Sequence, residues 1–221
     1  MTRASDPVRP QLLGAAYSVY VRIARLALME KGVDYDLAEI DIFGKHADDA
    51  AYLKLHPFGR IPTFRHGDFT LYETAAITRY VDEAFAGPSL QPADVRLRAR
   101  MMQMIGVMDS YLYRPLVWGL YVASDEAAKS GKPADAAALS VAMAKSRTAL
   151  GALADLTGDG PWLLGRQLTL ADLHLQPMLA YGCRTVEGRA LLQERPRMRE
   201  WWERMQTLPS VAATRFGAEL T

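Results

Sequence analysis

Apolar and polar positions in the first part of the chain follow two repeats, one typical of strands and one typical of helices. A short apolar run covers residues 11–15, and apolar residues then recur at helical spacing until Gly32, which suits the left-handed end of a helix. A second strand with a slip in its alternation follows over 35–42. Residues 48–55 then form a short helix that a His-Pro pair closes. The pattern predicts a β-α-β unit followed by a helix.

The next segment is predicted to be a hairpin and a helix. Two short apolar runs, 61–64 and 69–72, flank a Gly-Asp pair that favours a tight turn, and a helix follows over 74–85. The complete order is βαβαββα, which is the order of a thioredoxin-like domain. We therefore expect an α/β domain over residues 11–85, preceded by a tail at 1–10.

The rest of the chain reads as helix. Residues 86–93 contain a Gly-Pro and a Gln-Pro pair that break the periodicity, so we interpret them as a linker. An all-helical domain is expected over 94–221. Its predicted helices cover 94–118, 135–156, 169–181 and 197–208.

One local motif stands out in the helical part. Thr169 and Asp172 have the spacing of a capping box, in which Thr169 is the N-cap and the Asp172 side chain returns to the N-cap amide. By itself this motif predicts where a helix begins and says nothing about function.

Composition narrows the class of protein. The chain has 221 residues, of which 50% are hydrophobic and 23% charged, so it can form a sizeable core. The formal net charge of +1 gives no electrostatic reason to expect nucleic acid as a partner. Arginines gather at 96–100 and 184–204, but acidic residues lie among them, which is typical of a solvated helix face.

Neither a targeting segment nor metal or dithiol chemistry is indicated. The first ten residues lack the apolar stretch of a signal peptide, and no run reaches the roughly 18 apolar residues of a membrane span, so we expect a cytoplasmic protein. The single cysteine, Cys183, excludes an internal disulfide and a C-x-x-C pair. The histidines share no metal-ligand spacing with one another or with a carboxylate cluster, so no metal is expected.

The segment 56–81, which reads HPFGRIPTFRHGDFTLYETAAITRYV, has the features of a peptide-binding site. Pro62 at the start of a strand suggests an edge position, a turn or a cis bond, and each leaves the backbone N–H and C=O of Ile61 for a partner. An extended peptide could pair with Ile61 while a carboxylate lies on the amides that open the helix at Thr74. Glu73 could bind the amine of the same peptide.

A γ-glutamyl peptide carries that amine and that carboxylate at one end, and the segment resembles the glutathione-binding half of the cytosolic glutathione transferases, with Pro62 as their cis-proline. The capping box follows residues 161–165, PWLLG, as it does in that family. The resemblance covers nearly the whole chain and indicates a bacterial-type member. It implies a glutathione transferase fold, glutathione as co-substrate, a hydrophobic electrophile and a homodimer.

A thiol has a pKa of about 8.5 and is mostly protonated at neutral pH, so a transferase has to stabilise the glutathione thiolate. Ser18 lies between the first strand and the first helix, where its O–H could donate to the sulfur and the helix N-terminus adds a favourable field. Its spacing is similar to that of the serine-type phi, theta and zeta classes. The tyrosine of other classes would fall on Gly14. Tyr17 and Tyr20 flank Ser18 and stay open as alternatives for the same hydrogen bond.

Further site residues are implied by the resemblance. Lys45 and His46 lie in the loop where the family often places a basic residue for the glycine carboxylate. Tyr111 and Trp118, on the first long helix, are candidates to line the electrophile pocket. Nothing in the sequence identifies the electrophile.

Two other functions are alternatives to a glutathione transferase. A non-catalytic member could keep the fold and the peptide site as a binding or interaction module. A redox protein of the thioredoxin type is opposed by the absence of an active-site cysteine.

Overall fold

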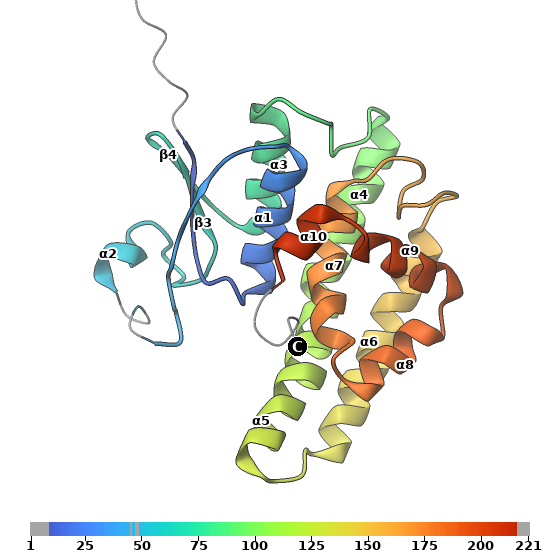
Figure 1. Cartoon of the computed structure of the whole chain (residues 1–221). Helices are drawn as coiled ribbons and strands as arrows, with labels where there is room; N and C mark the ends of the chain where they lie inside the picture. Colours follow the sequence, from blue (N-terminus) through green and yellow to red (C-terminus); the bar gives the residue numbers. More distant parts are fainter. Residues whose placement is uncertain (1–8, 45, 47–48, 216–221) are drawn as a thin grey trace, which may run out of the picture. The chain divides into compact units, whose positions relative to one another are not determined.

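The computed structural model describes residues 9–44, 46 and 49–215 (Figure 1). The chain divides into two compact units. One unit comprises the chain up to Ser89 together with the segment from Pro209, and the other runs from Leu90 to Leu208. The first contains a small mixed sheet with helices and the second is helical, so the fold class predicted from the sequence is confirmed.

The first unit contains a four-stranded sheet in the order β2-β1-β3-β4. Its elements are β1 (Gln11–Leu13), α1 (Val19–Glu30), β2 (Asp36–Ala38), α2 (Ala50–Leu53), β3 (Thr63–His66), β4 (Phe69–Tyr72), α3 (Thr74–Ala84) and α10 (Pro209–Ala213). Strands β1 and β2 are parallel, whereas the pairs β1–β3 and β3–β4 are antiparallel. The predicted order βαβαββα is confirmed. The first two strands are shorter than predicted, because only three residues of each join the ladder.

Helices α1 and α3 lie side by side and are joined by a buried ion pair. Lys31 Nζ, at the C-terminal end of α1, lies 3.1 Å from Asp82 Oδ1 in the last turns of α3, and both side chains are almost fully buried. Lys31 also donates to the carbonyl of Pro88 at 3.0 Å. Because a buried charge without its partner is costly, this pair fixes the two C-terminal ends together. The two helices consequently begin at the same end of the unit.

The C-terminal segment packs against α1 through a buried arginine. Arg22 is fully buried, and its Nε donates to Thr214 Oγ1 at 3.2 Å while its Nη2 donates to the carbonyl of Val211 at 3.3 Å. The Ser210 hydroxyl donates to the carboxylate of Glu30. The segment from Pro209 therefore completes the first unit, although the sequence pattern had grouped it with the helices before it.

The second unit consists of helices and their connections. They are α4 (Val95–Val107), η1 (Met108–Leu112), η2 (Arg114–Val122), α5 (Ala123–Ser130), α6 (Ala136–Leu156), α7 (Leu170–Gly182), α8 (Val186–Gln193) and α9 (Pro196–Gln206). The first predicted helix continues beyond its expected end through the π-helical segments η1 and η2 into α5. Helix α8 lies within the part predicted to be helical but was not among the helices whose ranges were predicted. Its Gly188 disfavours a helix locally, but any Cβ there would clash with the carbonyl of Gly182 at the end of α7.

Helix α7 is buried along its whole length and begins at the predicted capping box. Asp172 Oδ2 accepts hydrogen bonds from the backbone N–H and the hydroxyl of Thr169, both at 2.8 Å. Oδ1 accepts from the N–H of Leu163 at 2.9 Å and from Trp201 Nε1 at 2.8 Å. Burial raises the pKa of Asp172, while these four bonds favour its ionised form. The residue therefore joins α7 to α9 and to the loop before it, beyond the capping role that the sequence predicted.

Replacing Asp172 by Ala is expected to lower the free energy of unfolding by about 3–5 kcal/mol, because several buried donors lose their acceptor at about 1–3 kcal/mol each. The matched control is Asp135→Ala, which removes an exposed N-cap whose Oδ1 accepts from Ala137 and Ala138 at 2.9 and 3.1 Å. That change should cost only about 1 kcal/mol. Urea unfolding measures both, and equal losses would show that Asp172 is no more than a cap.

His174 lies within α7, fully buried, and its Nδ1 donates to the carbonyl of Leu170 at 2.7 Å. Burial lowers the pKa of His174 to about 4. In the unfolded chain a histidine has a pKa of about 6.5. Between pH 4 and pH 6.5 the unfolded chain therefore binds a proton that the folded chain does not. The folded state should therefore lose stability as the pH falls from about 6.5 towards 4.

Between pH 7 and pH 4.5, protonation of His174 in the unfolded chain is expected to lower the free energy of unfolding by about 2–3 kcal/mol. His174→Gln, which does not titrate, should show a correspondingly smaller pH dependence of its urea midpoint. The control is His66→Gln, because His66 is only half-buried in β3 and contacts Tyr80 Oη at 2.9 Å. An unchanged pH dependence in His174→Gln would contradict a neutral buried imidazole.

Candidate active site

The register of the sheet brings four chain segments to one end of the first unit. Leu13 pairs with Ala38 on one side and with Thr63 on the other, and Thr63 pairs with Tyr72. The chain after β1, after β2, before β3 and after β4 therefore leaves the sheet at the same end. These are the segments that carry the site residues predicted from the first part of the sequence.

Ser18 lies at the first of these exits, as the N-cap of α1. Its Oγ accepts a hydrogen bond of 3.4 Å from the N–H of Val21. Because the oxygen is the acceptor in this bond, the hydroxyl proton is not used by it. The half-buried hydroxyl lies at the positive end of the α1 dipole, where a thiolate would be stabilised.

Tyr17 has a partner for its hydroxyl proton. Its Oη donates to Asp41 Oδ1 at 2.9 Å. Burial and this bond raise the pKa of Tyr17 above its usual value. A phenol has one proton to donate, so the bond to Asp41 competes with any bond from Tyr17 to a sulfur. Tyr20 is half-buried on the first turn of α1 and stays an alternative to Ser18.

The loop after β2 is folded around Asp41. Its carboxylate accepts from the N–H of Phe43 at 3.0 Å, and this bond, followed by the one from Tyr17, holds the pKa of Asp41 below its usual value. The N–H of Asp41 donates to His46 Nδ1 at 3.0 Å. The Nε2 atom of His46 then carries the ring proton and can donate to a carboxylate. Lys45 lies outside the described residues.

The Ile61–Pro62 peptide bond is cis, one of the three alternatives that the sequence suggested. Strand β3 begins at Thr63 and lies between β1 and β4, so the edge position is wrong for this strand. Ile61 precedes the ladder and lies close to Gly14. A Cβ at Gly14 would lie 2.5 Å from Val21 Cγ2 and 3.2 Å from Ile61 Cβ, so glycine allows the end of β1 to approach both.

Glu73 has an unusual backbone conformation. Its φ of 69° is the only positive value at a non-glycine position among the described residues. Such a conformation costs on the order of 1 kcal/mol or more and occurs often at ligand sites. The Glu73 side chain is exposed and does not cap α3, which leaves the amides from Thr74 onward for a ligand.

A tyrosine that the sequence did not single out holds the loop before the cis bond. Tyr52 Oη donates to the carbonyl of Arg60 at 2.6 Å and lies 3.0 Å from Thr63 Oγ1. The His56 ring packs on Tyr72, with ring centres 4.8 Å apart, and burial lowers the pKa of His56. The aromatic residues of this segment could have suggested such packing, but nothing local in the sequence indicates the partners.

The two residues predicted for the electrophile pocket lie in the second unit. Tyr111 is 67% exposed, whereas Trp118 is half-buried and its Nε1 donates to Tyr113 Oη at 3.0 Å. The guanidinium carbon of Arg114 lies 5.6 Å from the centre of the Trp118 ring. Trp118 is thus held in place by its neighbours, and the role of both residues stays a prediction.

The Cys183 thiol is not activated as a nucleophile. Burial raises the pKa of the Cys183 thiol to about 11, so it is protonated near neutral pH. In the part of the chain that the structure describes, no three His, Cys, Asp or Glu side chains are grouped as metal ligands. No described helix combines the length and apolar character that a membrane span requires.

Comparison with known proteins agrees with this geometry. The N-terminal domain of glutathione S-transferases matches residues 12–89, and the C-terminal domain matches 111–209. Glutathione S-transferase F14 of Arabidopsis thaliana is 31% identical over 85% of this chain and 75% of its own length. Glutathione S-transferase F13 of the same plant is 26% identical over 90% of this chain and 92% of its own. The crystal structure of glutathione transferase F7 from Populus trichocarpa covers 93% of this chain and 97% of its own, at 26% identity and a TM-score of 0.81.

Proposed function

The chain belongs to the glutathione S-transferase family, and we propose that it stabilises the thiolate of glutathione for attack on a hydrophobic electrophile. The observation that carries this proposal is the convergence at one end of the sheet. The register places the α1 N-terminus with Ser18, the cis bond at Ile61 and the α3 N-terminus with Glu73 at that end.

The backbone of the tripeptide fits the groups at this end. The main chain of Ile61 lies beyond the last pair of the ladder, where it can pair with the cysteinyl residue of glutathione. The γ-glutamyl carboxylate then lies on the amides from Thr74 onward, and the Glu73 carboxylate binds the amine. At the other end of the tripeptide, Lys45 and His46 Nε2 bind the glycine carboxylate.

Ser18 supports the chemical step. Its hydroxyl donates a hydrogen bond to the glutathione sulfur, and the α1 N-terminus adds a positive field, so both favour the thiolate over the thiol. The sulfur lone pair forms a bond to the electrophilic carbon. In a displacement the bonding electrons leave with the departing group, and in an addition they move to the acceptor atom, which then takes a proton. Tyr111 and Trp118 contact the hydrophobic part of the electrophile in this proposal.

A second copy of the chain is the proposed protein partner. The first unit exposes three large aromatic side chains that come from β4 and from the loop before β3. They are Phe58 at 68%, Phe69 at 45% and Tyr72 at 36% exposure. Burial of such rings is a common source of dimer stability. A homodimer that acts in the cytoplasm without nucleic acid or a metal is the form that we propose.

Ser18→Ala is expected to lower kcat/KM for conjugation of an aryl halide about 10- to 1,000-fold, because a hydrogen bond to a charged group contributes about 1.5–3 kcal/mol. Glutathione binding should persist, since Ser18 contacts only the sulfur, and the pH–rate profile should move upward. Tyr17→Phe and Tyr20→Phe are the matched controls. Normal turnover in Ser18→Ala with a large loss in one tyrosine variant would move the role to that tyrosine.

Glutathione at 100 times its Kd is expected to add roughly 2.7 kcal/mol to the stability of the folded chain and so to raise Tm. Glu73→Gln should reduce this shift, whereas Glu83→Gln, an exposed glutamate on α3 that pairs with Arg79, should not. The isomeric tripeptide with an α-linked glutamate should give little shift. Equal shifts with both peptides would remove Glu73 and Thr74 from the site. If neither glutathione binding nor turnover is detected, the proposed function is wrong.

A further inference from the structure

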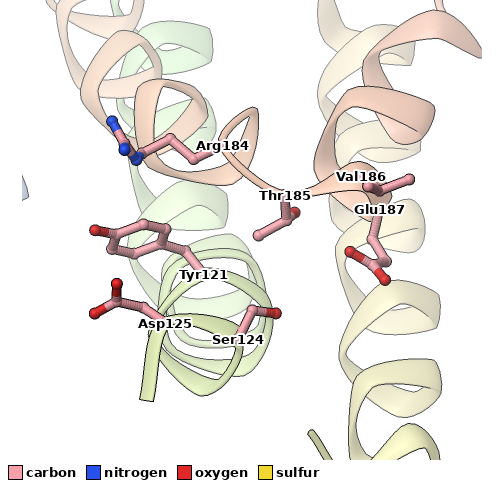
Figure 2. Close-up of a pocket in the computed structure, with 7 residues that line it drawn as sticks. All are labelled: Tyr121, Ser124, Asp125, Arg184, Thr185, Val186 and Glu187. Atoms are coloured by element: carbon pink, nitrogen blue, oxygen red, sulfur yellow. The ribbon is translucent and has the colours of Figure 1, made fainter. Parts of the chain in front are cut away.

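A cavity of about 360 Å³ lies within the second unit (Figure 2). Tyr121, Ser124 and Asp125, from η2 and α5, and residues 184–187, at the turn from α7 to α8, line it. None of these residues belongs to the proposed glutathione site, which lies in the other unit. The volume is within the range of small-molecule sites.

One side of the cavity holds the positive charge of the exposed Arg184 side chain. The guanidinium carbon of Arg184 lies 5.7 Å from the centre of the Tyr121 ring, and that ring packs edge-on against Tyr181 with centres 4.7 Å apart. The Arg184 guanidinium lies against the face of the Tyr121 ring on this side. No ion pair within the described part of the chain involves Arg184. The guanidinium is therefore available to an anionic group of a ligand.

The opposite side holds a negative charge on a rigid turn. Thr185 Oγ1 donates to the carbonyl of Gly182 at 2.9 Å and accepts from the N–H of Gly188 at 3.0 Å, which fixes the start of α8. Glu187 follows in the first turn and is half-buried. Figure 2 shows its side chain and that of Ser124 on opposite walls. Glu187 forms no ion pair with any other described residue.

The third charged residue of the lining, Asp125, already forms an ion pair. Asp125 lies beside Tyr121 and pairs with Lys129, with 2.6 Å between Oδ2 and Nζ. One cation and one anion are then left, Arg184 and Glu187, and they do not pair with each other. A simple anion would be repelled by Glu187 and a simple cation by Arg184, whereas a molecule with both charges satisfies both residues.

We propose that this cavity binds a small zwitterion, a dipeptide whose ammonium and carboxylate lie at opposite ends. Its carboxylate lies on the Arg184 guanidinium, and its ammonium donates to the Glu187 carboxylate and to Ser124 Oγ. A carboxylate and a guanidinium match in geometry, and an ammonium has three donors for these two oxygens. The exposed side chain of Val186 at the rim contacts the apolar part of the ligand.

The test is calorimetric titration of the full chain with leucylglycine, with its methyl ester and with its N-acetyl form, in saturating S-methylglutathione so that the proposed glutathione site is filled. Leucylglycine should bind with a Kd on the order of 1 mM. The ester, which lacks the carboxylate, and the acetylated form, which lacks the ammonium, should bind at least about tenfold weaker. L-leucine in the same titration distinguishes an amino acid from a dipeptide.

Arg184→Gln and Glu187→Gln should each weaken leucylglycine binding about tenfold or more, and Arg184→Gln should leave binding of the methyl ester unchanged. The matched control is Glu126→Gln, because Glu126 is exposed on α5 next to Asp125 and does not line the cavity. Unchanged Tm values show that the variants are folded. The absence of heat at about 10 mM dipeptide, or binding that neither cavity variant alters, overturns the proposal. The variants decide this even if S-methylglutathione does not bind and the proposed transferase function is wrong.

Discussion

The hydrogen-bond register that joins β1 to β2 and β3 determines which chain segments meet at the candidate active site. Leu12 pairs with Phe64, and both side chains are fully buried on the same face of the sheet. A shift of β3 by one residue relative to β1 would turn Phe64 to the other face and separate it from Leu12, so the core specifies the register. The register in turn fixes where the chain enters α1 and α3. The first unit therefore positions its ligand groups through the pairing and packing of strands outside the site itself.

The order of the elements could be predicted from the sequence because its signals are local. Apolar spacing, a Gly-Asp turn and a capping box each act within a few residues. The bounds of helix α8 were not predicted, because they depend on a contact that is not local. Gly188 disfavours a helix in its own segment but permits a close approach to Gly182 in the preceding helix. That requirement exists only once the two helices are packed, and no local pattern expresses it.

The same division applies to the candidate site. The positions of Ser18, Ile61 and Glu73 at element boundaries could be predicted, because boundaries have recognisable residues. Their roles towards glutathione are still predictions. The bond between Tyr17 and Asp41, 24 positions apart, could not be predicted, because it depends on the path of a loop. It changes the interpretation of the site, since it gives the Tyr17 hydroxyl a partner other than the sulfur.

The buried arginine of α1 has a consequence for how the chain is made. Arg22 bonds to Thr214, 192 positions later, and the whole second unit is synthesised between them. During synthesis the first unit can form its sheet and its two long helices, but Arg22 then lacks these acceptors. Contacts so distant in sequence form slowly because the intervening loop must close. The nascent first unit is thus incomplete until the ribosome has released the segment that begins at Pro209, and a chain that stops before it leaves a buried guanidinium without those two bonds.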